Sequence, residues 1–187
     1  RSLPLVEAAF QWARHAQPIQ PIMMTVYGSP AMERRILELS DVISFHNYSP
    51  APELEQHITR LRAHGRPLLC TEWLNRPGNQ GVGTCLPVLA RQGVGGFHWG
   101  LVNGKTQTHY AWGSKAGAPA PQVWQHDLFR PDHTPYDARE LEFFQRTIRQ
   151  QAKPAVAAEG QWPVNQAWAW YSRQPWQIGR ASCRERV

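Results

Sequence analysis

The sequence predicts an α/β fold built on a parallel sheet, and two features of its first 100 residues lead to this prediction. Segments with the apolar spacing of a helix alternate with short apolar segments that are typical of buried strands. The links between these segments are short. Alternation of this kind is typical of a parallel sheet with helices packed outside it. A doubly wound sheet and a (β/α)₈ barrel both fit the pattern, and its four strands would make half of a barrel.

The elements follow one another in a regular order. Helices are expected at residues 3–16, 31–40, 52–65 and 83–93. Strands are expected at residues 19–28, 41–48, 66–73 and 94–102. The apolar spacing also predicts the buried helix faces, which are Leu5, Ala9, Trp12 and Ala16 in the first helix and Leu54, Ile58 and Leu61 in the third.

The alternation ends near residue 103. Residues 103–137 are rich in Trp, Pro, Gly and His, and an irregular segment of this length is usually functional or disordered. The aromatic residues favour an ordered segment. Asp137 and Glu140 have the spacing of a capping box, which predicts a helix at 138–150. Its expected apolar face is Leu141, Phe144 and Ile148.

The last part of the chain differs from the rest. Residues 151–177 are rich in Trp, and we interpret them as a linker or as the start of a further module. Residues 178–187, IGRASCRERV, have no helical or strand periodicity. They can be encoded by ATCGGAAGAGCGTCGTGTAGGGAAAGAGTG, which closely resembles a widely used sequencing adapter. We therefore expect this segment to be adapter read-through, and the alternative is an ordinary basic tail.

The composition excludes several classes of protein. Hydrophobic residues make up 42% of the chain and charged residues 18%, which is a globular composition. No apolar run approaches the roughly 20 residues of a membrane span, and no signal peptide is recognised. The net charge of +6 is spread without the basic stripe that nucleic-acid binding requires. The His and Cys spacings do not match a metal site, so no cofactor is expected.

Polar and aromatic residues collect at the carboxyl ends of the predicted strands. His46 and Tyr48 end the second strand, Glu72 ends the third and Trp99 ends the fourth. In parallel α/β folds these ends meet at one edge of the sheet, where functional sites form. We therefore expect the four side chains to lie close together.

Strand periodicity places Glu72 on the same face as Leu68 and Cys70. If this face points inward, Glu72 converges with the tyrosine and the tryptophan of the neighbouring strands. A tyrosine hydroxyl within reach would orient an ionised carboxylate that acts as a nucleophile. A tryptophan offers a flat surface for the apolar face of a sugar ring, so the combination suggests sugar chemistry.

Each of these residues also has an ordinary structural explanation. A single Glu at a strand end is commonly a solvated charge or a helix cap, and the tripeptide His-Asn-Tyr is commonly a turn. A lone Trp such as Trp99 is commonly part of the core. Their occurrence on successive strands favours the functional interpretation.

On these residues, the chain resembles the C-terminal half, strands five to eight, of a retaining glycoside hydrolase of the (β/α)₈-barrel clan. It most resembles the cellulase-like family 5, over roughly residues 1–150. The resemblance implies that Glu72 of CTEW is the catalytic nucleophile, and that His46 and Tyr48 of FHNY and Trp99 of FHWG contact the substrate. Further predicted substrate contacts are Tyr27, Trp73, Asn103 and Lys105.

The resemblance also implies a second carboxylate, a Glu usually preceded by Asn at the end of strand four. No Asn-Glu dipeptide occurs in the chain. We therefore expect a fragment that lacks its acid/base Glu together with the N-terminal half of the barrel, and that is inactive alone. The parent protein is expected to hydrolyse a β-linked poly- or oligosaccharide and to be secreted or periplasmic.

Two alternatives stay open. One is a non-catalytic carbohydrate-binding barrel that has lost its acid/base. The other is an unrelated α/β protein such as a doubly wound hydrolase, although neither a G-x-S-x-G elbow nor a phosphate-binding glycine loop occurs in the sequence.

Overall fold

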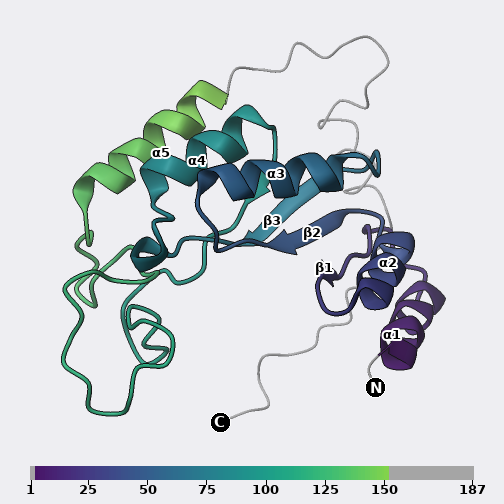
Figure 1. Cartoon of the computed structure of the whole chain (residues 1–187), viewed down its shortest axis with the longest axis horizontal. Helices are drawn as coiled ribbons and strands as arrows, with labels where there is room; N and C mark the ends of the chain where they lie inside the picture. Colours follow the sequence, from purple (N-terminus) through teal and green to yellow (C-terminus); the bar gives the residue numbers. More distant parts are fainter. Residues whose placement is uncertain (1–2, 152–187) are drawn as a thin grey trace, which may run out of the picture. The chain divides into compact units, whose positions relative to one another are not determined.

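Four parallel strands form the sheet of the computed structural model, which describes residues 3–151 (Figure 1). The strands lie in the order β1 (Thr25–Val26), β2 (Ile43–His46), β3 (Leu68–Glu72) and β4 (Gly95–Gly96). Sequential neighbours with a helix between each pair are the mark of repeated βαβ units. The predicted α/β class is therefore confirmed, and the sheet is consistent with half of a (β/α)₈ barrel.

Five α-helices accompany the sheet in this part of the chain. They are α1 (Leu3–His15), α2 (Pro30–Leu39), α3 (Ala51–Arg62), α4 (Val82–Arg91) and α5 (Ala138–Gln151). A short 3₁₀ turn, η1, spans Arg76–Gly78 after β3. No helix in residues 3–151 is long and apolar enough to cross a membrane. The interpretations of the stretches from residue 152 onward, as linker or module and as read-through, lie outside the described residues.

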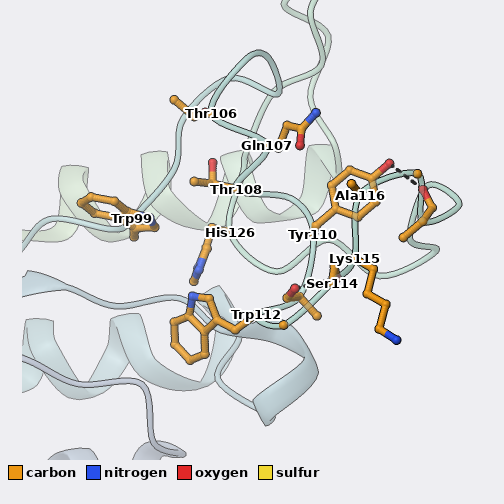
Figure 2. Close-up of a pocket in the computed structure, with 14 residues that line it drawn as sticks. Trp99, Thr106, Gln107, Thr108, Tyr110, Trp112, Ser114, Lys115, Ala116 and His126 are labelled. Carbon is orange, nitrogen blue, oxygen red and sulfur yellow. Dashed lines mark hydrogen bonds between the residues drawn. The ribbon is translucent and has the colours of Figure 1, made fainter.

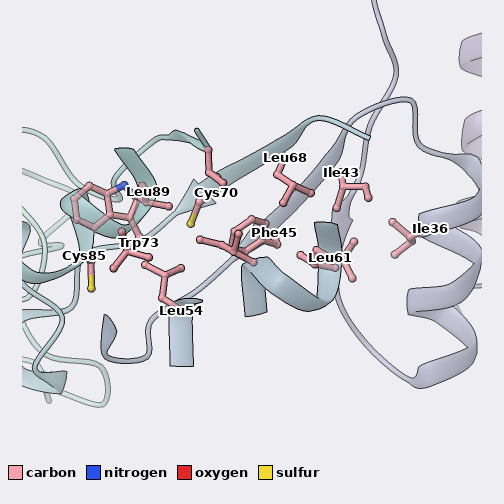
Figure 3. Packing of buried hydrophobic residues seen from close by; sticks show 14 of the residues in the cluster. Ile36, Ile43, Phe45, Leu54, Leu61, Leu68, Cys70, Trp73, Cys85 and Leu89 are labelled. Atoms are coloured by element: carbon pink, nitrogen blue, oxygen red, sulfur yellow. The ribbon is translucent and has the colours of Figure 1, made fainter. Parts of the chain in front are cut away.

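The hydrophobic core lies between the sheet and the helices that cover it (Figure 3). Ile43 and Phe45 of β2 are fully buried, and so are Leu54 and Leu61 of α3. The Phe45 ring lies 4.8 Å from the ring of His57, which also belongs to α3. The predicted apolar face of the third helix is thus confirmed. The side of β2 that bears Phe45 faces this helix.

The predicted apolar face of the first helix is wrong. Trp12 is 66% exposed and Leu5 is 61% exposed, whereas α1 buries Val6 and Phe10. Val6 and Phe10 are four residues apart and share the buried face of the helix. Two ion pairs join α1 to later residues, since Glu7 binds Arg35 of α2 at 2.6 Å and Arg14 binds Asp41 at 2.9 Å.

The two outer strands are much shorter than predicted. Before β1, the Ile22 N–H donates to the Asp41 carboxylate and the Met24 N–H donates to the Ser40 hydroxyl, so side chains replace strand partners there. In β4, a Cβ atom at Gly95 would lie 2.6 Å from Leu69. A side chain at this position would therefore require the Leu69 side chain to move.

The predicted inward face of β3 is also wrong. Leu68 and Cys70 are buried in the core, and Cys70 pairs with Phe45, which faces α3. Thr71 lies on the opposite side, where its hydroxyl is 3.5 Å from that of Thr25. Glu72 therefore does not owe its position to simple alternation along the strand.

The helix α5 begins where predicted, but its contacts differ. Asp137 caps its first turn by accepting a hydrogen bond from the Arg139 N–H at 2.9 Å. Glu140 binds Arg76 through both carboxylate oxygens, in place of the reciprocal bond of a capping box. Leu141 and Phe144 pack against the core, whereas Ile148 is exposed.

Candidate functional site

The Glu72 carboxylate at the end of β3 binds two side chains from the end of β2. The Tyr48 hydroxyl donates a hydrogen bond to Glu72 Oε2 at 2.8 Å, and His46 Nδ1 lies 3.1 Å from the same oxygen. Both contacts end on Oε2, so Oε1 is left outside this pair of hydrogen bonds. We call His46, Tyr48 and Glu72 the strand-end cluster. The expected proximity holds for these three side chains, whereas the contacts of the cluster do not include Trp99, the fourth side chain of that expectation.

A register shift between β2 and β3 brings the cluster together. Phe45 pairs with Cys70, but the next residue, His46, pairs with Glu72 and skips Thr71. Such a β-bulge redirects a side chain at the end of a strand. It turns Glu72 out of the core and toward His46, which simple strand periodicity could not predict.

The second nitrogen of His46 continues the network across the sheet. His46 Nε2 lies 3.3 Å from the Thr25 hydroxyl, which in turn accepts a hydrogen bond from the Ser44 hydroxyl at 3.3 Å. All of these contacts are satisfied when His46 carries its proton on Nδ1 and accepts from Thr25 through Nε2. In this state His46 donates to Glu72 Oε2 and helps to hold the carboxylate in place.

Tyr48 is a stable hydrogen-bond donor in this setting. Its pKa is raised above the ordinary value, chiefly because burial disfavours the phenolate and further because its hydroxyl is bonded to Glu72. The hydroxyl therefore stays protonated and keeps donating to the carboxylate at any physiological pH.

An aromatic surface borders the cluster on the side of the long loop. The Trp112 ring meets the Tyr48 ring edge-on at 4.8 Å, and the His126 ring lies 5.5 Å from both of them. Trp99, Trp112 and His126, which we call the aromatic wall, all line a cavity of about 600 Å³ (Figure 2). The rest of its lining comes from residues 106–118. Glu72 is not part of the lining, and the wall connects the cavity to the cluster through Tyr48.

Long-range polar contacts hold the wall in place. Arg76, in η1 just after β3, binds both oxygens of Glu140 at 2.9 and 2.6 Å and donates to the Trp124 carbonyl at 3.1 Å. Its guanidinium also lies 4.6 Å from the centre of the Tyr136 ring. Arg76 thus ties the loop before His126 to the segment that follows Glu72.

The other residues that were predicted to contact the substrate differ in whether they line the cavity. Trp99 is partly exposed and lines the cavity, as a sugar platform requires. Trp73 is only 1% exposed and packs against Phe144, so it belongs to the core rather than to a substrate surface. Tyr27 is exposed, and neither Asn103 nor Lys105 is among the residues that line the cavity.

Trp112 and His126 were not identified from the sequence. The only sequence signal was the density of aromatic residues in the segment 103–137. Nothing in that signal distinguishes Trp112, which faces Tyr48, from Trp124, which stacks on Tyr136 at 4.7 Å. Within residues 3–151, no group of three or more His, Cys, Asp or Glu side chains is arranged to hold a metal ion.

Comparison with known proteins supports the fold. No family model matches the chain, and no curated protein matches it. Among solved structures, it is similar to the Faecalibacterium prausnitzii β-glucuronidase, with a TM-score of 0.52 and 13% sequence identity. The matched region covers 76% of this chain and 28% of that β-glucuronidase. At this identity the similarity shows the fold alone, which is an α/β fold shared with the matched part of that β-glucuronidase.

Proposed function

We propose that the chain is the part of a retaining glycosidase that carries the catalytic nucleophile, Glu72. The observation that supports this most directly is the strand-end cluster, in which Tyr48 and His46 both bind Glu72 Oε2. Two donors on one oxygen fix the orientation of the carboxylate. The cavity beside the cluster provides room for a substrate of the size of a few sugar units.

In the proposed reaction, Glu72 Oε1 attacks the anomeric carbon of a β-linked sugar. A bond forms between Oε1 and that carbon as the bond to the leaving oxygen breaks, and a second carboxyl group donates a proton to that oxygen. Water then hydrolyses the glycosyl-enzyme, with the second carboxylate acting as base. Trp99 and Trp112 provide flat surfaces on which sugar rings can stack.

The second carboxyl group belongs to the rest of the parent protein in this proposal. A retaining mechanism needs two carboxyl groups about 5–5.5 Å apart. The contacts of the Glu72 carboxylate come from Tyr48 and His46, and none of the cavity-lining residues carries a carboxyl group. The chain alone would therefore bind sugar but not hydrolyse a glycoside.

The test is the Glu72→Gln variant of the full-length protein, assayed on a panel of 4-nitrophenyl β-glycosides that includes the glucoside, xyloside, galactoside and glucuronide. We expect kcat to fall at least about a thousandfold while the Kd for an oligosaccharide changes little. Glu53→Gln is the matched control, because Glu53 is an exposed residue in the first turn of α3. Turnover by Glu72→Gln at the wild-type rate would refute the assignment.

In residues 3–151, neither the side chains that bind Glu72 nor the cavity-lining residues carry a carboxyl group, which also fits a non-catalytic carbohydrate-binding barrel. The same panel separates the two functions. A full-length protein that binds oligosaccharides but hydrolyses none of the glycosides would support the binding protein. Sequencing the locus upstream of Arg1 gives an independent answer, because an enzyme requires a Glu at the end of strand four.

A further inference from the structure

One ring nitrogen of His126 is hydrogen bonded, and the other has no hydrogen-bond partner among residues 3–151. Its side chain is buried and lines the cavity between Trp99 and Trp112 in Figure 2. Nδ1 is hydrogen bonded to the Leu74 carbonyl. Nε2 is buried and has no hydrogen-bond partner among residues 3–151. A buried polar atom without a partner is uncommon and calls for an explanation.

The bond to Leu74 fixes the tautomer of His126. A carbonyl can only accept, so Nδ1 must carry the proton. Burial lowers the pKa of His126, which keeps the ring neutral. Nε2 therefore presents a lone pair, and the ring cannot rotate to hide it without breaking the bond at Nδ1.

The surroundings of His126 hold the ring firmly. Leu74 has a left-handed backbone with φ of 85°, and its N–H donates to the Gln80 side chain at 2.8 Å. On either side of His126, the Gln125 side chain accepts from the Trp112 N–H at 2.7 Å, and Asp127 accepts from the Thr108 hydroxyl at 2.6 Å. The acceptor is thus preorganised before any ligand binds.

Five other buried side-chain atoms in residues 3–151 lack partners, and two of them face each other. Asp127 Oδ2 and His109 Nδ1 lie 3.7 Å apart, so a small movement would pair them. His126 differs from the residues that bear these five atoms because it is among those that line the cavity.

We infer that His126 Nε2 accepts a hydrogen bond from a hydroxyl group of a sugar bound in this cavity, and that it selects for sugars that carry this hydroxyl. The inference rests on the proposed function for the nature of the ligand. The exposed parts of Trp99 and Trp112 offer stacking surfaces for the sugar ring, and a neutral acceptor between them pairs with an O–H donor. A site built to bond a hydroxyl discriminates strongly against the analogue that lacks it.

Two substitutions separate the roles of the two nitrogens. Asn places an amide N–H near the position of Nδ1, so His126→Asn keeps the donor to Leu74 and removes the acceptor. Gln reaches the position of Nε2, so His126→Gln keeps an acceptor and removes the donor. In the full-length protein we expect His126→Asn to lower kcat/KM about tenfold and His126→Gln to lower it less. The reverse order would assign His126 a structural role only and overturn the inference.

Monodeoxy sugars identify the hydroxyl. The probe is the 4-nitrophenyl β-glycoside that the wild type hydrolyses fastest, together with its monodeoxy analogues. We expect the wild type to discriminate about tenfold against one analogue, and His126→Asn to lose that discrimination while His126→Gln keeps most of it. Equal discrimination by the wild type and His126→Asn would refute the inference even where Glu72→Gln has confirmed the glycosidase. If no glycoside is hydrolysed, the same series is compared by Kd on oligosaccharides.

Nuclear magnetic resonance of the wild-type imidazole tests the same point without a variant that could fail to fold. The long-range ¹H–¹⁵N spectrum should show His126 neutral and protonated at Nδ1, and adding the probe glycoside should shift the Nε2 resonance. A His126 ring protonated at Nε2, or an Nε2 resonance unchanged by a bound sugar, would overturn the inference.

Discussion

The strand-end cluster and the aromatic wall lie side by side, but they depend on different kinds of contact. The cluster lies at the ends of two paired strands. His46 and Glu72 are the last residues of β2 and β3 and pair with each other, and Tyr48, which binds Glu72, follows β2 by two residues. Trp112 and His126 of the wall lie on a long irregular segment that is fixed by polar contacts distant in sequence, among them those of Arg76 with Trp124 and Glu140 and that of His126 with Leu74. The stability of the wall is therefore concentrated in few interactions, whereas the sheet that supports the cluster spreads its stability over many.

The largest effect is expected from removing the main contact of the wall. Arg76 and Glu140 are only 8% and 17% exposed, so Arg76→Ala leaves a largely buried carboxylate without its partner. Loss of one partner of such a pair costs about 3–5 kcal/mol of unfolding free energy. Denaturant unfolding of the full-length protein measures this. The control is Arg139→Ala, since the Arg139 side chain is 88% exposed and its loss should change stability little.

The matching experiment on the cluster is Tyr48→Phe. It removes one hydrogen bond to a charged acceptor, which is worth about 1.5–3 kcal/mol, or roughly 10- to 150-fold in kcat/KM. It should lower the unfolding free energy by less than Arg76→Ala does. The control is the same substitution in the Glu72→Gln background, where the charged acceptor is gone. An equal further loss of oligosaccharide affinity there would show that Tyr48 acts on the substrate directly rather than through Glu72.

The same comparison explains how much of the site could be predicted from the sequence. The alternation of helices and strands, and the polar residues that end each strand, identify Glu72, His46 and Tyr48 as neighbours. Strand periodicity does not explain the position of Glu72, because periodicity alone would place Glu72 with Cys70 in the core. The bulge after Phe45 corrects this, and a bulge has no signal in the sequence of a single chain.

The wall could not be predicted in the same way. Trp112 and His126 are brought together by contacts between residues far apart in sequence, such as the bond from His126 to Leu74. Trp73 shows the opposite failure, since it follows Glu72 directly but is buried against Phe144 of α5. Local sequence patterns predict which residues lie at the end of a strand. They do not predict which residues of a distant helix or loop will pack against them.

Acid should destabilise the folded chain through three buried histidines, two of them near the wall. Burial is the main cause that lowers the pKa values of His98 and His126 near the wall, and of His57 beneath β2. The unfolded chain takes up these protons near pH 6.5, before the folded chain does. Stability is therefore complete above pH 6.5 and falls as the pH drops below it, by at most about 1.4 kcal/mol per pH unit for each histidine.

Urea unfolding between pH 7.5 and 5 measures this dependence. His126→Asn should flatten the curve, because it removes one of the three protonation steps. His64→Gln is the control, since His64 is an exposed residue after α3. A curve that is unchanged by His126→Asn would show that burial does not suppress protonation of this ring.

The smallest expected effect comes from the cap of α5, the helix whose Glu140 holds Arg76. Asp137 accepts a hydrogen bond from the Arg139 N–H, and the loss of such a cap in Asp137→Ala costs about 1 kcal/mol of unfolding free energy. Its pKa is lowered, first by the hydrogen bonds from the Arg139 side chain, so this contribution is present above about pH 3.8 and is lost as the pH falls further. Asp137→Asn keeps the cap without the charge and should recover most of the stability at pH 7. If both variants lose as much stability as Arg76→Ala, then the start of α5, and not the Arg76–Glu140 pair, is what holds the aromatic wall.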